Sequence, residues 1–230
     1  MKISVGRKEH MENRFIKELE QLKMTILQMA ALTEKAMGKA VRAFFERNIE
    51  LAEEVIQGDQ EINLLEVEAD RQSLRLLALD QPLARDLRFI VGCMRISVDL
   101  ERIADLAAGV ARRAIFLSNR PPLPHNYSLE QLAETATDML RTVIDAFAKL
   151  SVERAKDVCQ MDDTADELNL AVLKSLLNYM VKEVPAVERS VQTIITARYL
   201  ERIADQATNI AESVVFIAQG VNIKHHCEEG

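Results

Sequence analysis

The amino-acid sequence predicts an all-α protein made of two tandem, pseudo-symmetric, antiparallel three-helix bundles. The composition favours helix, because Leu, Ala, Glu, Met and Arg fill the long stretches while tryptophan is absent and glycine and proline are scarce. Apolar residues recur at intervals of three and four, which is the period of an amphipathic helix. The chain also repeats itself, since Asp59 matches Asp162 and Pro82 matches Pro185 at one offset of 103 residues. Such a repeat indicates two copies of one helical unit.

Three helices are predicted in the first half, over residues 11–47, 49–79 and 83–118. Asn48 interrupts the apolar pattern and is suited to a turn and to the N-cap of the second helix. Pro82 ends that helix, because its ring clashes with the helical turn before it. Short turns make consecutive helices antiparallel, so these three are expected to form a bundle.

The second half predicts the same order of helices, over residues 128–150, 152–182 and 186–219. The turns between them fall at Ser151 and at Pro185, which corresponds to Pro82 of the first half. A second antiparallel bundle is therefore expected to follow the first.

These helices divide the chain into a first bundle at residues 11–119 and a second at residues 128–220. Between them, residues 120–127 are rich in proline and are expected to form a stiff linker. Gly220 stops the last helix. The remaining residues, 221–230, are predicted to be a disordered tail.

One five-residue segment occurs in both halves, as Glu101-Arg102-Ile103-Ala104-Asp105 and again at residues 201–205. Its glutamate and aspartate are one helical turn apart and therefore lie on one face of the helix. Apolar residues spaced back from Glu101 and Glu201 place that face toward the core. Buried carboxylates must be protonated, paired with cations or bound to metal. Glu101, Asp105, Glu201 and Asp205 are thus candidate metal ligands, and salt bridges to Arg102, Arg202 or Arg198 are the alternative interpretation.

Counting residues from the turns gives further candidates at the same height as this repeated acidic motif. Asp59 and Asp162 are predicted to face it from the second helix of each half. On the first helix of each half, the count gives Glu34 in the first half and Asp138 or Glu134 in the second. Asn209, one turn after Asp205, is a further candidate that would add an amide oxygen. Carboxylates from several helices, without cysteine or histidine, suit hard cations or oxygen-ligated iron or manganese. The sequence therefore predicts two carboxylate metal sites.

Composition and motifs exclude several other functions. The net charge of −7 and the pI near 5.3 argue against binding of nucleic acid. The sequence contains no glycine-rich phosphate loop, no His-Glu-x-x-His zinc motif and no nucleophile elbow, so no enzyme active site is expected. Cys93 and Cys159 fall within helical stretches and are expected to be reduced thiols. No signal-peptide core or membrane span is evident, so a cytoplasmic location is expected.

Several segments in order resemble the PhoU family. These are Asp80-Gln81-Pro82-Leu83-Ala84-Arg85-Asp86-Leu87-Arg88, the segment from Leu100 to Asp105, and the segment from Glu201 to Ile210. The resemblance extends from about Phe15 to Gly220. It implies two three-helix bundles, homodimers, and multinuclear iron or zinc clusters held by the repeated acidic motifs.

The resemblance also implies a function in phosphate uptake and signalling. Members of the family are bacterial regulators that contact the ATPase of the phosphate ABC transporter and the phosphate-sensing histidine kinase. They keep the phosphate-starvation response off when phosphate is plentiful. A metal-binding, non-enzymatic adaptor of this kind is the expected function. The alternatives are a carboxylate-bridged metalloenzyme, such as an iron oxidase or phosphohydrolase, and a helical scaffold without metal.

Overall fold

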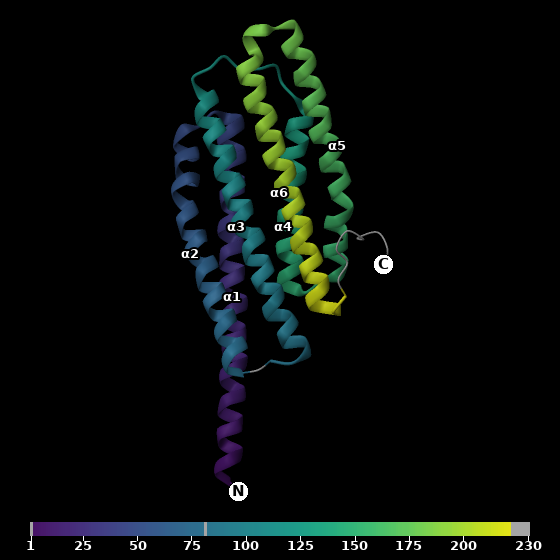
Figure 1. The fold of residues 1–230 in the computed structure, drawn as a ribbon. Helices are drawn as coiled ribbons and strands as arrows, with labels where there is room; N and C mark the ends of the chain where they lie inside the picture. The colour runs from purple at the N-terminus through teal and green to yellow at the C-terminus, as the bar shows by residue number, and fades with distance from the viewer. Residues whose placement is uncertain (1, 81, 222–230) are drawn as a thin grey trace.

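The computed structural model describes residues 2–80 and 82–221, with side chains from residue 13 onward except that of residue 80. Within this part of the chain the structure consists of six α-helices and one short 3-10 helix, η1, at Val184–Ala186 (Figure 1). The predicted all-α class and the six predicted helices are confirmed. Their bounds are α1 Lys2–Glu46, α2 Ile49–Asp80, α3 Ala84–Ser118, α4 Tyr127–Lys149, α5 Val152–Lys182 and α6 Val187–Gln219.

Local residue chemistry explains several of the helix ends. The side-chain oxygen of Asn48 accepts a hydrogen bond of 2.9 Å from the backbone N–H of Leu51, which caps α2. Ser151 caps α5 in the same manner. Gly220 ends α6 with a φ of 75°, a left-handed conformation that glycine adopts without steric cost. The predicted turns at Asn48 and Ser151 and the predicted stop at Gly220 are therefore confirmed.

The predicted bounds differ from the observed ones by one residue at several helix ends and by nine residues at the start of α1. Helix α1 begins at Lys2 rather than at Met11, and its first turns project beyond the bundle (Figure 1). This stretch contains no proline, and extending an existing helix is far easier than starting one. Helix α4 begins at Tyr127 rather than at Ser128, because the side chain of Asn126 accepts the hydrogen bond from the backbone N–H of Leu129. Residues 222–230, most of the predicted tail, lie outside the described part of the chain.

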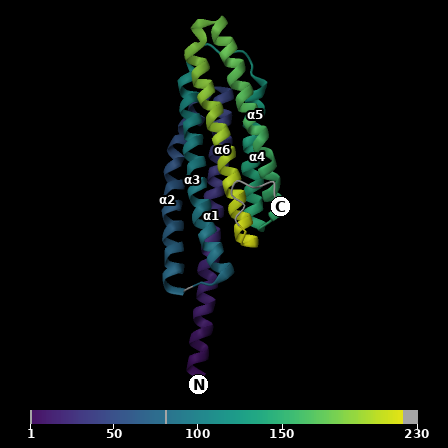
Figure 2. The ribbon, with the colours of Figure 1, turned by 45° about the vertical axis from the view of Figure 1, so that its right-hand side comes forward.

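Helices α3 and α6 form the centre of the molecule and make its most extensive helix–helix contact. Helices α1 and α2 cover α3, and helices α4 and α5 cover α6 (Figures 1 and 2). The two hairpins point in opposite directions, because α2 leads into α3 at one end of the molecule and α5 leads into α6 at the other. The two bundles thus share one elongated body rather than standing apart.

Small residues allow the two central helices to approach closely. Ala104, Ala107, Ala204 and Ala207 are buried, and the buried side chains of both halves form one continuous hydrophobic cluster. Gly109 on α3 leaves no room for a side chain, because an added Cβ would lie 2.7 Å from a ring atom of Tyr199. No described helix has an apolar stretch long enough to span a bilayer.

Candidate metal centre

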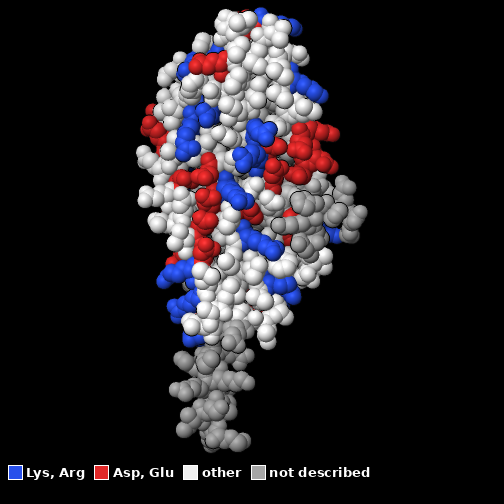
Figure 3. All heavy atoms as spheres, viewed as in Figure 1, with Lys and Arg blue, Asp and Glu red and all other residues white. Residues whose placement is uncertain are grey.

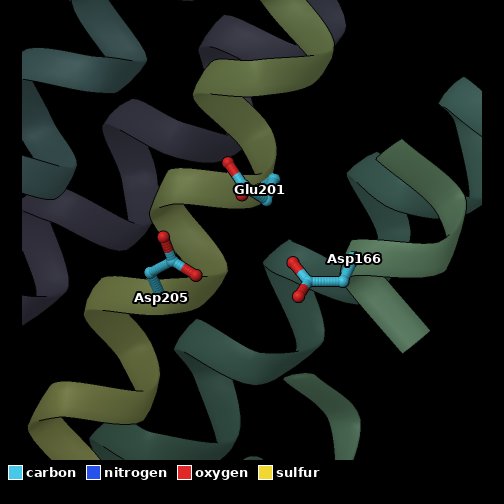
Figure 4. Close-up of side chains that lie close together, drawn as sticks. All are labelled: Asp166, Glu201 and Asp205. Carbon is cyan, nitrogen blue, oxygen red and sulfur yellow. The ribbon is translucent and has the colours of Figure 1, made fainter. Parts of the chain in front are cut away.

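Three carboxylates of the second half converge between α5 and α6. Asp166 projects from α5 toward the turn of α6 that carries Glu201 and Asp205 (Figure 4). One oxygen atom of each residue lies within 4.8 Å of one such oxygen of each of the other two. Among the described side chains, this is the one group of three or more acidic, histidine or cysteine residues that is close enough to hold a metal ion together.

The surroundings of Glu201 and Asp205 disfavour the charged forms of these two residues, whereas Asp166 is exposed. Burial, and then the negative charges of Glu201, Asp162 and Asp166, raise the pKa of Asp205 to about 6. Burial is likewise the main reason that the pKa of Glu201 is raised, and the charge of Asp166 adds to it. We call Asp162, Asp166, Glu201 and Asp205 the second-half acidic cluster.

Asp162 lies one helical turn before Asp166 on α5. Its carboxylate accepts a hydrogen bond of 3.2 Å from the hydroxyl of Thr208 on α6. Burial raises the pKa of Asp162, and Thr208 partly offsets this effect because it stabilises the charged form. The hydrogen bond thus orients a fourth acid next to the three that converge.

The arrangement fits a cation better than it fits salt bridges. The buried Oε2 atom of Glu201 has no hydrogen-bond partner among the described residues. Arg198 and Arg202 lower the pKa of Glu201 only as secondary effects, and no ion pair within the described part of the chain joins either of them to the cluster. A buried carboxylate oxygen without a partner is costly. A bound cation would satisfy it, and a ligand set of oxygen atoms alone suits hard cations.

The first half gathers acids from the corresponding helices, α2 and α3. The charge of Asp105 helps to raise the pKa of Asp59, after the effect of burial. Burial, and then the charges of Asp105, Glu66 and Asp59, raise the pKa of Glu101. Asp59, Glu66, Glu101 and Asp105 form the first-half acidic cluster. Figure 3 shows red acidic side chains along the boundary of α2 and α3, and also on the right, where α5 lies.

The two clusters differ at two positions of the repeat. At the offset of 103 residues, Asp166 of α5 corresponds to Asn63 of α2, and Glu66 of α2 corresponds to Asn169 of α5. Each half therefore has an amide at one position where the other half has a carboxylate, and these two positions are about one helical turn apart. Among the described side chains, no three carboxylates of the first half lie as close together as Asp166, Glu201 and Asp205. The position that Asp166 occupies, which we call the central position, carries Asn63 in the first half.

The prediction that the repeated acidic motif faces the core was wrong. Glu101, Glu201 and Asp205 are half-buried, and Asp105 is exposed. Their neighbours Leu100, Ile103 and Leu200, Ile203 take the core positions instead. The acids therefore lie at the edges of the α2–α3 and α5–α6 contacts, where solvent and ions have access.

Three of the other candidates have different surroundings. Glu34 on α1 and Asp138 on α4 both form ion pairs with Arg141, at 3.1 Å and 3.4 Å. Asn209 lines a groove between α3 and α6 together with Arg95 and Arg102. We therefore do not include these three residues in the candidate metal centre.

Sequence reasoning missed Asp166 and Glu66. Asp166 follows Asp162 by four residues, so the two share one face of α5. The same one-turn spacing marks the repeated acidic motif, and it was the available signal for Asp166. Glu66 gives a weaker signal, because its counterpart in the other half is an amide.

Comparison with known proteins agrees with this architecture. The family model described as the PhoU domain matches residues 26–114 and again residues 129–214. The chain belongs to the PhoU family. Among its relatives is the phosphate-specific transport system accessory protein PhoU homolog of Aquifex aeolicus, with 39% identity over 94% of this chain and 98% of that protein. The accessory protein PhoU of Escherichia coli strain K12 is 29% identical over 96% of this chain and 92% of its own length.

Solved structures of the PhoU family have the same fold. The crystal structure of PhoU from Pseudomonas aeruginosa gives a TM-score of 0.88 at 37% identity, covering 90% of this chain and all of that one. The phosphate transport system regulatory protein PhoU from Streptococcus pneumoniae gives a TM-score of 0.83 at 29% identity, covering 90% of this chain and 98% of that one. The relatives are thus accessory proteins of phosphate transport.

Proposed function

We propose that this PhoU-family protein is a non-enzymatic, metal-binding adaptor that negatively regulates phosphate uptake and phosphate-starvation signalling. It would act in the cytoplasm and link the ATPase of the phosphate ABC transporter to the phosphate-sensing histidine kinase. The names of its relatives support an accessory role in phosphate transport. The kinase and the negative sign of the regulation follow from the family resemblance.

The convergence of Asp166, Glu201 and Asp205 is the observation that carries the metal-binding part of the proposal. These residues would hold one cation between α5 and α6, with Asp162 close by to ligate directly or through water. The first-half acidic cluster would hold a second cation between α2 and α3. Iron or zinc is the metal that the family resemblance implies, and both accept carboxylate oxygen.

The role of the chain's own residues is positioning. Glu201 and Asp205 are fixed one turn apart on a central helix, while Asp166 and Asp162 come from an outer helix. A cation supplies positive charge that neutralises the acids and joins the outer helix to the central one. Because α5 is an outer helix that packs on α4 and α6, occupancy of the cation site would determine how firmly α5 is held. Binding or loss of the cation would therefore change the outer surface that α5 presents to partner proteins, and this change is the proposed signal.

Elemental analysis of untagged protein tests the metal site. Wild-type protein is expected to contain iron, zinc or another transition metal in stoichiometric amount, and Glu201→Gln combined with Asp205→Asn should lower that amount. Glu167→Gln is the matched control, because Glu167 is an exposed acid next to Asp166 on α5. Only trace metal in the wild type would refute the proposed site.

A pull-down from cells grown at high and low phosphate tests the adaptor function. The wild type is expected to retain the transporter ATPase and the kinase, with a balance that changes with phosphate. The double variant Glu201→Gln/Asp205→Asn should lose that change. Identical partners at identical levels for the wild type and the variant would remove the metal site from the signalling mechanism.

A further inference from the structure

Helices α3 and α6 have one face that no described helix covers. Helices α1 and α4 pack behind them in Figure 1, and α2 and α5 lie beside them to the left and right, as Figure 2 also shows. The two central helices run antiparallel, and the front of their contact is open. In helical bundles the groove between two neighbouring helices is where a further helix packs. This groove is therefore available to a segment of another molecule.

A hollow of about 460 Å³ lies on the open side of the α3–α6 contact. On α3, Cys93 and Leu100 are buried on the side of α1. Arg95 and Arg102 each follow two residues later, about 200° around the helix, and both line the hollow. Asn209 lines it from α6. Two positive side chains of α3 thus point into the one face that the chain leaves bare.

Three arginines of α3 recur along this side of the helix at intervals of seven residues, at positions 88, 95 and 102. Seven residues are close to two helical turns, so the three side chains lie on one stripe and are about 10 Å apart along the axis. The guanidinium group of Arg88 lies at the end of α6, where an added Cβ on Gly220 would be 3.3 Å from its Cζ atom. The stripe therefore follows the α3–α6 contact as far as the end of α6.

Two arginines of α6 continue this positive charge. Arg202 and Arg198 are exposed and lie seven and eleven residues before Asn209, which places all three on one face of α6. In Figure 3 blue side chains accordingly run down the middle of the molecule, over α3 and α6, with red side chains on both sides. The five arginines, together with Val91, Met94 and Val98 of α3, form what we call the basic groove.

We propose that the basic groove binds an acidic, helical segment of a partner protein. The acids of this segment recur every seven residues, because that spacing matches the arginines of α3 when the two helices lie side by side. Val91, Met94 and Val98 are half-buried and provide apolar surface between the arginines, so the segment carries apolar residues between its acids. The inference adds a surface and a partner chemistry to the adaptor function, and it does not depend on bound metal.

The arginines of the groove are able to bind a carboxylate. The guanidinium group of Arg95 stacks 4.6 Å over the ring of Phe216, which fixes its orientation and leaves its N–H edge for a ligand. The side chain of Arg102 is 60% exposed, and its ion pair with Asp99 is long, at 3.9 Å. Exposed ion pairs of this kind contribute little stability, so Arg102 can turn toward a ligand at small cost.

Two acids line the hollow, and they do not neutralise the groove. Asp99 is only 8% exposed and already pairs with Arg102, so little of its charge is directed toward a ligand. Glu212 is half-buried. A ligand therefore meets five arginines with two acids among them, and this surface favours negative charge.

The acidic clusters on either side of the groove limit what can bind there. The first-half acidic cluster lies at the α2–α3 boundary, and the second-half acidic cluster lies between α5 and α6. A single α-helix, about 10–12 Å across with its side chains, can lie over the middle and keep its acids away from both flanks. A wider polyanion such as nucleic acid meets the flanks and is repelled, which agrees with the net charge of −7.

Fluorescence anisotropy of a labelled synthetic peptide tests the groove in purified, metal-free protein. The probe is a helical peptide of three heptads with glutamate every seven residues, leucine between the glutamates on the same face, and alanine and glutamine elsewhere. The wild type is expected to bind it, and Arg95→Glu combined with Arg102→Glu should raise the dissociation constant by at least about tenfold. Arg71→Glu combined with Arg75→Glu is the control, because it changes the net charge equally at two exposed positions of α2. A wild type that does not bind the probe, or a control variant that loses as much affinity, would overturn the proposal.

A reversed peptide separates loss of binding from loss of fold. A probe with lysine in place of each glutamate should bind the Arg95→Glu/Arg102→Glu variant more tightly than it binds the wild type. A misfolded variant would not show this gain of affinity. Equal affinity of the lysine probe for both proteins would refute recognition by charge in the groove.

Two further probes test the spacing of the acids and the class of ligand. A peptide of the same composition with glutamate every five residues, which distributes the acids around the helix, should bind at least about tenfold more weakly. Inorganic phosphate should displace the heptad probe no better than chloride does at equal ionic strength. Equal binding of the two peptides would show that the groove does not read a helical face, and displacement by phosphate alone would make it a site for the free anion. Either result would overturn the proposal.

Discussion

Asn63 of α2 occupies the position in the first half that Asp166 of α5 occupies in the second. Asn63 forms a hydrogen bond with Asp59, one turn earlier on the same helix, and this bond favours the charged form of Asp59. Asp166 instead adds a negative charge next to Glu201 and Asp205. The repeat has thus kept acids on the corresponding helices of both halves but changed which position carries the acid.

This difference predicts that the two halves bind cations unequally. Isothermal titration of metal-free protein with Mn²⁺ or Zn²⁺ should resolve a tighter site that Asp166→Asn weakens by at least about tenfold, since it removes a direct ligand. Asn63→Asp should tighten the weaker site, because it supplies the missing central carboxylate. Asp163→Asn is the control for the loss of one charge from α5. Two sites that remain equal in every variant would show that the central position does not bind metal.

Without metal, the second-half acidic cluster is expected to destabilise the fold. Burial and like charges raise the pKa of Asp205 to about 6, so this group is still mainly charged at pH 7 and its charge opposes folding. Asp205→Asn should therefore increase the free energy of unfolding of metal-free protein at pH 7 by about 1 kcal/mol, a figure reduced for solvent screening of a partly exposed group. Urea denaturation measures this change.

The same variant should behave in the opposite way when metal is present. Saturating cation stabilises the wild type in proportion to its affinity, and Asp205→Asn should lose most of that stabilisation. A variant that is less stable than the wild type under both conditions would indicate that Asp205 serves the fold rather than a ligand.

The raised pKa of Asp205 also determines how stability and metal affinity vary with pH. The unfolded chain releases this proton near the ordinary value of 3.8, whereas the folded chain holds it up to about pH 6. The folded state therefore binds more protons between these values, and this group's contribution to the free energy of unfolding falls as pH rises through that window. Metal competes with the same proton, so metal affinity should rise as pH rises through 6 and level off above it. Titration calorimetry should show a steeper rise in the wild type than in Asp205→Asn, which retains only the raised pKa values of Glu201 and Asp162.

Local features of the sequence were sufficient to predict the helices. The caps at Asn48 and Ser151 and the stop at Gly220 depend on side chains within three or four residues of each helix end. The extension of α1 to Lys2 was missed because nothing in its first ten residues either favours or forbids a helix strongly.

The sequence predicted the positions of the acidic residues along the bundle axis more accurately than the directions in which their side chains point. Counting from the turns placed Asp59 near Asp105, and the structure brings these two acids close enough to interact. The same count placed Glu34 at that height, but this side chain points toward Arg141 of the other half. The direction depends on how α1 is rotated against α3 and α4, which is set by packing across the whole core. The extensive α3–α6 contact joins residues that are far apart in the sequence. No local sequence pattern therefore predicted it.

That central contact gives a last prediction, in which two glycines should respond oppositely to the same change. A Cβ added to Gly38 on α1 would meet no heavy atom of a neighbouring residue within 4 Å, so Gly38→Ala should stabilise the protein by the difference in helix propensity, about 1 kcal/mol. At Gly109 the added Cβ would lie 2.7 Å from the ring of Tyr199, which is closer than packed atoms allow. Overpacking of this kind costs about 1–3 kcal/mol and should exceed the gain in propensity. Gly109→Ala is therefore expected to lower the free energy of unfolding, as measured by urea denaturation of metal-free protein.

The outcome for Gly109 distinguishes a rigid contact between the halves from one that can adjust. Tyr199 is only half-buried, so its ring could rotate toward solvent. If Gly109→Ala were as stable as Gly38→Ala, the ring would have to move freely, and the α3–α6 contact would tolerate sliding. Tyr199→Ala in the Gly109→Ala background separates the two cases: removing the ring should recover the propensity gain only if the ring was the obstacle. A rigid contact is the expected result, because the buried alanines around Gly109 hold the two helices at close range.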